Sequence, residues 1–163
     1  MKVTVTGTPG TGKTSVSEKL EGYEKIHLTE FVKEHGLGTD GEVFEVDTEA
    51  MCEKLEEETS EGDYLIEGHL AHYISSDICI VLRCDPDELE ERLGERRYSE
   101  SKVRENVESE AMDLILQQAV QNQEAVVEVD TTGRTVEETV KAIEEKISEG
   151  KSSYGKVDWT DSL

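Results

Sequence analysis

The feature that most constrains the fold is a short stretch close to the start of the chain, GTPGTGKT at positions 7–14. It fits the pattern G-x-x-x-x-G-K-[S/T], in which glycines let backbone N–H groups point at the oxygens of a polyphosphate. Lys13 is placed to reach the β- and γ-phosphates, and Thr14 is placed to hold Mg²⁺ through its hydroxyl. The pattern works between a strand and a helix whose positive end faces the anion, so an ordinary glycine turn is the weaker interpretation.

The order of apolar runs along the chain meets this requirement. Strand-like runs alternate with helical patterns, which predicts a parallel sheet wrapped by helices and therefore an α/β fold. Helix starts are indicated by Asp85 before Pro86 and by Thr135 with Glu138. The expected strands are 2–6, 23–28, 64–67, 78–82 and 125–130. The expected helices are 13–21, a short one after Thr29, 48–59, one from Pro86 to near Gly94, 101–123 and one that ends at Gly150.

The chain has the size of a single domain. Its 163 residues suffice for one core but not for two, so we expect one domain over residues 1–150 and a tail over 151–163. The longest apolar runs have the length of a strand and no signal peptide is visible, so we expect no membrane segment and a cytoplasmic protein. Three cysteines without a CxxC pair indicate neither a disulfide framework nor a structural zinc site, and Cys79 fits a core position.

The charge of the chain is strongly negative. There are 39 Asp and Glu residues against 17 Lys and Arg residues, which gives a formal net charge of -22. Such a chain repels nucleic acid, so we expect no direct binding of RNA or DNA. One explanation is a halophilic source, because a Debye length of about 3 Å at ~1 M salt screens the self-repulsion. The other is an acidic face for a basic partner.

The few arginines of the chain are clustered. Four of the six, Arg92, Arg96, Arg97 and Arg104, fall within thirteen residues. Arg92 and Arg96 are four residues apart, so a helix that reaches both would present them on one face, where they could grip a phosphate from above. This pattern indicates a phosphate lid. The alternative is that these arginines pair with the surrounding glutamates on an exposed helix.

A carboxylate for Mg²⁺ is expected at the end of a neighbouring strand. Glu67 directly follows an apolar run, where an unpaired charge would be costly unless a metal or a partner compensated it. His69 stands two residues later, where it would face the γ-phosphate, and His72 follows three residues after that. The two histidines could share a metal, but no third ligand lies nearby in the sequence, and a hydrogen-bonded structural pair is more usual.

With loop, lid and strand end in place, the sequence resembles the adenylate kinase 6 family, small nucleoside monophosphate kinases of the archaeal type that also act in ribosome maturation. The resemblance covers about residues 1–150. It rests on GTPGTGKT, on IEGH, which is similar to the family's acidic-x-His signature, and on LEERLGERRYSESKVREN, which is similar to its short lid. Ordinary adenylate kinases carry an arginine after the aspartate and glycine of strand three, whereas His69 and Leu70 follow Glu67 and Gly68 here.

The resemblance implies a three-layer P-loop nucleoside monophosphate kinase fold with a short lid over about residues 95–105. It implies a monophosphate site across about 27–46, where Lys33 replaces the family's usual arginine and cannot make the same two-pronged contact. It also implies a basic small-subunit ribosomal protein as transient partner, which an acidic surface suits. The implied ligands of ATP are Gly10, Gly12, Lys13, Thr14, Ser15 and Arg96, those of Mg²⁺ are Thr14 and Glu67, and the catalytic group is Lys13, Glu67, His69 and Arg96.

Three functions fit these features. The first is transfer of the γ-phosphate of ATP to a nucleoside monophosphate, through positioning and charge neutralisation. The second is an ATP-driven assembly factor whose hydrolysis resets its grip on a ribosomal protein, and both outputs can share one site. The third is a small-metabolite kinase. Shikimate-type kinases would need an arginine cluster between strands two and three, and residues 27–66 contain no arginine.

Overall fold

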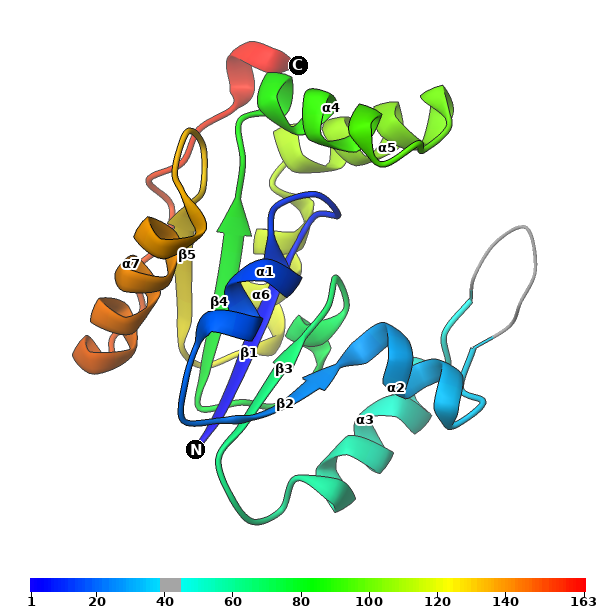
Figure 1. The fold of residues 1–163 in the computed structure, drawn as a ribbon, viewed down its shortest axis with the longest axis vertical. Helices are drawn as coiled ribbons and strands as arrows, with labels where there is room; N and C mark the ends of the chain where they lie inside the picture. Colours follow the sequence, from blue (N-terminus) through cyan, green and yellow to red (C-terminus); the bar gives the residue numbers. More distant parts are fainter. Residues whose placement is uncertain (39–44) are drawn as a thin grey trace.

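The computed structural model describes residues 1–38 and 45–163. Within them, five parallel strands form one sheet, and helices cover both of its faces (Figure 1). The strands, in the spatial order β2-β3-β1-β4-β5, are β1 (Lys2–Gly7), β2 (Glu24–His27), β3 (Tyr64–Glu67), β4 (Ile78–Arg83) and β5 (Val126–Asp130). The helices are α1 (Lys13–Lys19), α2 (Leu28–Glu34), α3 (Thr48–Glu58), η1 (Ala71–Tyr73), α4 (Pro86–Glu95), α5 (Glu100–Ala111), α6 (Leu114–Asn122), α7 (Val136–Glu149) and η2 (Thr160–Ser162). The predicted α/β fold class and the five-stranded parallel sheet are confirmed.

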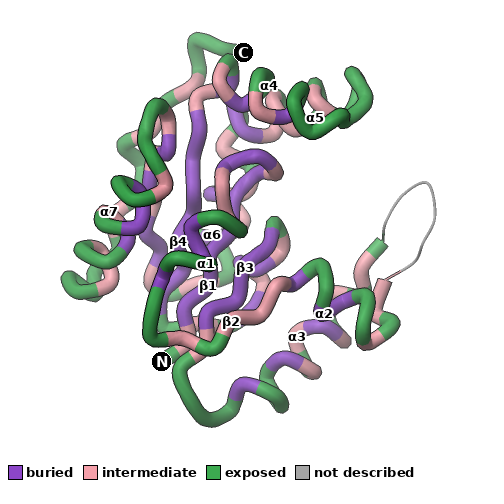
Figure 2. The backbone as a smooth tube through the Cα atoms, viewed as in Figure 1, coloured by how far each residue is buried: buried purple, intermediate pink, exposed green. Residues whose placement is uncertain are grey.

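The side chains of β1 point alternately to the two faces of the sheet. Val3 and Val5 point to one face, where they pack with Val16 of α1 and Ile143 of α7. The opposite face of β4 and β5 packs against α6, and Cys79 lies there fully buried, as expected from its position in an apolar run. Figure 2 shows that the central strands are buried while the outer surfaces of the helices are exposed. Burial of these apolar side chains is the main contribution to the stability of the fold.

A second apolar cluster supports the edge of the sheet at β2 and β3. Phe31 of α2 and Leu55 of α3 are buried against Ile66 of β3. An isolated antiparallel bridge between Gly38 and Val46 follows α2 in the chain. The predicted monophosphate region, residues 27–46, therefore falls on α2 and the segment after it, and its residues 39–44 lie outside the described part of the chain.

The predicted helix over residues 101–123 is wrong, because the chain breaks it into α5 and α6. At the break, Asp113 has a left-handed backbone with φ 56°, a conformation that Asp tolerates better than most residues. Its Oδ1 accepts a hydrogen bond from Arg83 Nη2 at 2.5 Å. The continuous helical pattern of the sequence did not reveal the break, because the interaction that holds it comes from a strand thirty residues away.

Helix ends follow the capping signals of the sequence. Asp85 Oδ1 accepts a hydrogen bond from the backbone N–H of Asp87 at 2.9 Å, and Thr135 Oγ1 accepts one from Glu138 at 3.2 Å. Each bond satisfies an N–H group that the first turn of the helix leaves unpaired. At the other end of α7, Gly150 has φ 64°, which glycine adopts without strain.

Residues 151–163, the expected tail, continue beside β5 after α7. Ser153 forms a parallel bridge with Val127, and its N–H donates to the carbonyl of Val126 at 2.9 Å. The C-terminus lies at the same end of the molecule as α4 (Figure 1). Trp159 is half-buried. In the described part of the chain, every helix is too short or too polar to cross a bilayer.

Candidate active site

The candidate site lies at the carboxyl edge of the sheet, where the loop over residues 7–14 connects β1 to α1. Gly10 and Gly12 have φ 95° and φ 99°, a left-handed conformation that other residues adopt only with strain. A Cβ atom on Gly10 would lie 2.9 Å from Leu89 Cδ1, so glycine also lets the loop pack against α4. The loop that the sequence predicted for a polyphosphate is therefore present between a strand and a helix.

Lys13 folds back over this loop. Its Nζ donates hydrogen bonds to the carbonyl oxygens of Gly7 and Thr8, at 3.0 and 3.2 Å. Burial is the main cause that lowers the pKa of Lys13 to about 8. The Arg96 guanidinium acts in the same direction, and the Glu67 and Glu110 carboxylates oppose it. The ammonium is thus charged at neutral pH but poorly compensated, which makes it a ready partner for an anion.

Glu67 and Thr14 lie together at the edge of the sheet. Thr14 Oγ1 donates to Glu67 Oε1 at 3.3 Å, and Glu67 is 7% exposed. A hydroxyl and a carboxylate are both hard oxygen donors, so this pair fits the chemistry of Mg²⁺. The distance agrees with the predicted magnesium ligands, although their role stays a prediction.

His27 is a residue of this site that the sequence analysis did not single out. Its Nδ1 lies 2.8 Å from Glu67 Oε1, because the last residues of β2 and β3 are direct partners in the sheet. The sequence predicted the two strands that carry His27 and Glu67. It did not predict that these strands are neighbours in the sheet, which is what places His27 beside Glu67.

The two nearby histidines have different surroundings. His69 is exposed at the strand edge, and partial desolvation together with the positive charges of Lys13 and Lys102 lowers its pKa to about 4. His72 is fully buried, with Nδ1 2.8 Å from Thr6 Oγ1 and Nε2 3.0 Å from Gln118 Oε1. His72 is therefore a hydrogen-bonded structural residue. Across residues 1–38 and 45–163, no group of three or more His, Cys, Asp or Glu side chains gathers in a way that could hold a metal ion.

The predicted lid corresponds to the end of α4, a turn and the start of α5. Arg92 Nη1 donates to Thr131 Oγ1 at 3.2 Å, and its Nη2 donates to Glu88 Oε2 at 2.9 Å, so this arginine makes the glutamate pair that was the alternative interpretation. The helix ends at Glu95 and does not reach Arg96, which caps it. Arg96 therefore follows Arg92 by about one turn at the end of α4, and both line the same cavity.

A cavity of about 450 Å³ lies between this lid and the loop. Its lining includes Gly10, Gly12, Ser15, Arg92 and Arg96, together with Arg134 from the segment after β5. Three arginines converge there in a chain that has only six. Arg97, with φ 60°, and Arg104 are exposed and do not line this cavity. The cavity therefore combines the predicted loop and lid residues in one anion-attracting space.

A second and much smaller cavity, of about 10 Å³, lies beside His69. It is lined by Leu28, Thr29, Val32, Val46, Gly68, His69 and Leu70. Lys33, the predicted monophosphate ligand, lies on α2 next to Val32, exposed, and outside this lining. His69 thus stands at the boundary between the phosphate loop and an apolar hollow.

Known proteins resemble this chain over almost its whole length. The chain matches the family described as AAA domain over residues 3–113. It is 43% identical over 166 residues to a protein of Thermococcus gammatolerans named "Putative adenylate kinase", covering 99% of this chain and 94% of that protein. It is 46% identical over 182 residues to a protein of Methanosarcina barkeri with the same name, covering 99% of this chain and 98% of that protein.

Solved structures share the fold at lower identity. A deoxyadenosine kinase from M. mycoides with bound dATP has a TM-score of 0.58 and 17% identity, covering 91% of this chain and 100% of that one. A shikimate kinase from Bacteroides thetaiotaomicron has a TM-score of 0.56 and 18% identity, covering 91% and 98%. The phosphate loop, the strand-edge carboxylate and these comparisons lead to one conclusion: the chain belongs to the AAA-domain family and, within it, to the group of the archaeal adenylate kinase relatives that the sequence resembles.

Proposed function

We propose that this protein is a phosphotransferase that moves the γ-phosphate of ATP to a nucleoside monophosphate and also hydrolyses ATP. The observation that carries the proposal is the grouping of Lys13, Thr14 and Glu67 beside the phosphate loop, at the carboxyl edge of the sheet. The cavity of about 450 Å³ under the arginines of the lid has a size that suits ATP. The names of the full-length relatives favour adenylate kinase chemistry, with AMP as the first acceptor to test.

In this mechanism the chain acts by positioning and by charge. The N–H groups of the loop and the ammonium of Lys13 hold the phosphates, and Arg96 approaches them from the lid side. Thr14 and Glu67 would hold Mg²⁺, which when bound neutralises charge on the phosphate oxygens. His69, neutral at pH 7 because its pKa is about 4, can accept a hydrogen bond from the attacking water and orient it. No covalent bond to the protein is required.

The acceptor decides between a nucleotide kinase and a small-metabolite kinase. A shikimate-type acceptor needs several arginines around its site, and residues 27–66 contain none. The cavity lined from Leu28 to Leu70 is apolar, but its free volume of about 10 Å³ is too small for a nucleobase, so an acceptor would have to open it. Lys33 is then the nearest cation on α2 for the monophosphate, as a point charge without a two-pronged contact.

The test is acceptor-dependent consumption of ATP. Wild type is incubated with ATP, Mg²⁺ and each nucleoside monophosphate in turn, at low and at molar salt, with Lys13→Ala as the inactive control. We expect AMP or another monophosphate to raise turnover above plain hydrolysis, and we expect Lys13→Ala to abolish both activities. Turnover by Lys13→Ala near the wild-type rate would remove the phosphate-loop mechanism. Stimulation by shikimate or another metabolite, without any by a monophosphate, would favour the small-metabolite kinase.

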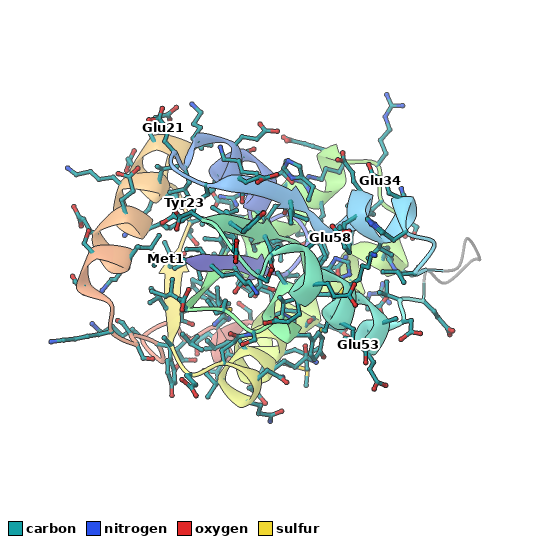
Figure 3. All side chains as sticks on the ribbon, turned by 90° about the horizontal axis from the view of Figure 1, so that it is seen from below. Met1, Glu21, Tyr23, Glu34, Glu53 and Glu58 are labelled. Atoms are coloured by element: carbon teal, nitrogen blue, oxygen red, sulfur yellow. The ribbon has the colours of Figure 1, made fainter. Side chains whose placement is uncertain are left out.

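A role as an ATP-driven assembly factor is a second proposal, supported by the charge of the surface. The net charge of -22 is spread over exposed helices, and Figure 3 shows the side chains of Glu21, Glu34 and Glu53 projecting at the rim of the molecule. Such a surface suits a basic small-subunit ribosomal protein and no nucleic acid, and we place this role in maturation of the small ribosomal subunit in the cytoplasm. Binding of that ribosomal protein in an ATP-dependent manner at molar salt tests it. Binding that vanishes at molar salt and ignores ATP would reduce it to non-specific charge attraction.

A further inference from the structure

A buried cluster of charged side chains lies behind the phosphate loop and contains none of the proposed ligands. Its centre is Arg83, the last residue of β4, whose side chain is 1% exposed. The guanidinium donates hydrogen bonds to the carboxylates of Glu110, Asp113 and Glu128, at 3.1, 2.5 and 2.6 Å. The loss of hydration on burial offsets much of the attraction in such a cluster, so stability alone is a poor explanation for it.

Glu110 connects this cluster to the phosphate loop. Its Oε1 accepts a hydrogen bond from Thr8 Oγ1 at 3.0 Å, and its Oε2 accepts one from the N–H of Cys84 at 2.8 Å. Glu110 and Thr8 are 2% and 1% exposed, so neither bond competes with bulk water. One carboxylate thus joins the loop, the end of β4 and the last turn of α5.

Arg83 holds the break between α5 and α6 at both of its sides. Nη2 donates to the backbone carbonyl of Glu110 at 3.0 Å and to the Asp113 carboxylate. Glu110 lies in the last turn of α5, and Asp113 is itself the left-handed residue that redirects the chain. Because a guanidinium is planar and its donors form a rigid fork, these contacts define the direction in which α5 leaves the break.

The helix held in this way belongs to the lid. Val103 and Val107 of α5 pack against the buried Leu89 and Leu93 of α4, so the two helices form one packed unit above the loop. Figure 1 shows the pair lying over the end of the sheet where β1 enters the loop. Arg96 follows the last residue of α4, so a rotation of α5 about the break changes the distance between Arg96 and the loop.

We infer that Arg83 and Glu110 are positioning residues for phosphoryl transfer, which fix the break between α5 and α6 to Thr8 of the phosphate loop. The inference rests on the proposed function, because it takes Arg96 to act on ATP from the lid. A displacement of about 1 Å at a reacting centre can cost on the order of 100-fold in rate. Directional ionic contacts specify one arrangement of lid and loop, which an apolar cluster of the same volume would define less strictly.

Glu128 provides a matched control within the same cluster. Its Oε2 accepts from Arg83, but its Oε1 accepts from the backbone N–H groups of Gly155, Lys156 and Val157, at 3.1, 3.3 and 3.3 Å. It therefore joins Arg83 to the C-terminal segment and not to the loop or the lid. The side chains of Glu110 and Glu128 are both 2% exposed, so Glu110→Met and Glu128→Met remove one buried carboxylate each from the same guanidinium.

The test compares these two variants with wild type in ATP turnover, ATP binding and hydrogen exchange. We expect Glu110→Met to lower kcat by about 10- to 100-fold while the Kd for ATP changes less than about threefold, because the lid acts mainly on the transition state. Amide exchange in α5 should rise with it. We expect Glu128→Met to lower the unfolding temperature about as much as Glu110→Met does, but to keep kcat within about threefold of wild type. Equal losses of kcat in both variants, or no loss in Glu110→Met, would overturn the inference.

Thr8→Val keeps the test decisive if Glu110→Met does not fold. It preserves side-chain volume and removes only the hydroxyl that reaches Glu110, so we expect the same loss of kcat and faster exchange in α5, and unchanged kcat would overturn the inference. Wild-type turnover separates this inference from the proposed function. A wild type without turnover refutes the proposed function, whereas an active wild type with unaffected variants refutes only the positioning role. Amide exchange in α5 reports whether Glu110 and Thr8 hold this helix to the phosphate loop, whether or not the wild type turns over ATP.

Discussion

The Thr14 hydroxyl lies 3.3 Å from the Glu67 carboxylate, although the two residues are 53 positions apart in the chain. The contact arises because β1 and β3 are neighbouring parallel strands that end at the same edge of the sheet, with Val5 opposite Glu67. Thr14, which follows the phosphate loop, and Glu67, at the end of β3, thus form one pair of oxygen ligands although they are distant in the sequence. The proposed chemistry depends on this pair.

Replacement of Glu67 by Gln should weaken the response to Mg²⁺. The amide keeps the shape of the side chain but loses the charge that holds the cation, so the Mg²⁺ concentration for half-maximal turnover should rise on the order of tenfold or more. Both phosphoryl transfer and hydrolysis should fall. Titration of turnover with MgCl₂ measures the effect, with the exposed Glu21→Gln as control. An unchanged Mg²⁺ dependence in Glu67→Gln would show that the carboxylate is not a ligand.

The lowered pKa of Lys13, about 8, predicts proton uptake when ATP binds. Phosphate oxygens stabilise the ammonium and raise its pKa, so at pH 8 to 9 binding should take up a fraction of a proton, and the affinity for ATP should fall as pH rises above about 8. Calorimetric titration without Mg²⁺ in two buffers with different ionisation enthalpies measures the uptake. Lys13→Met should show none. Uptake of the same size in that variant would assign the proton to another group.

Arg96 and Arg97 are adjacent in the lid, but we expect only Arg96 to contribute to turnover. Arg96 lines the cavity with Gly10 and Gly12, whereas Arg97 lies outside that lining. Arg96→Ala should lower kcat by about 10- to 100-fold and change the Kd for ATP much less, since the contact strengthens as charge develops in the transition state. Arg97→Ala should stay within about threefold of wild type, as surface substitutions usually do. Equal losses of kcat in steady-state assays would mean that the roles are wrongly assigned.

His72 should make the fold sensitive to mild acid. Burial is the main cause that lowers its pKa to about 4, and the acceptor at Gln118 opposes the shift. Because the folded pKa lies below the ordinary value of 6.5, the unfolded state binds more protons between these values, and stability is lost as pH falls from about 6.5 to 4. The full effect is about 3 kcal/mol in the free energy of unfolding. Urea unfolding of wild type and His72→Gln across this range measures it, and parallel pH profiles for both proteins would contradict it.

The sequence predicted most of the fold because its signals are local. The glycine loop, the apolar strands and the caps at Asp85, Thr135 and Gly150 each lie within one element and its neighbours in the chain. The break at Asp113 was missed because a distant residue, Arg83, stabilises its left-handed backbone.

The parts of the site that depend on local patterns were also predictable from the sequence. The loop and the strand-end carboxylate carry their own patterns, whereas the contact of His27 with Glu67 depends on which strands are neighbours in the sheet. The acidic partners of Arg83 come from α5, the break after it and β5, three segments that no spacing rule connects. Interactions between elements, not the elements themselves, are what the sequence alone left undetermined.

The central claim, one site with two outputs, is tested most directly by following the γ-phosphate of labelled ATP into nucleoside diphosphate and into inorganic phosphate, in wild type and in His69→Ala. His69 can orient a water for in-line attack but is not needed when a monophosphate oxygen is the nucleophile. We predict that His69→Ala lowers release of inorganic phosphate by about tenfold or more and preserves most of the transfer to the monophosphate. Glu21→Gln, an exposed change outside residues 27–46, should leave both unchanged. Equal losses of both products in His69→Ala, or unchanged hydrolysis, would contradict the account.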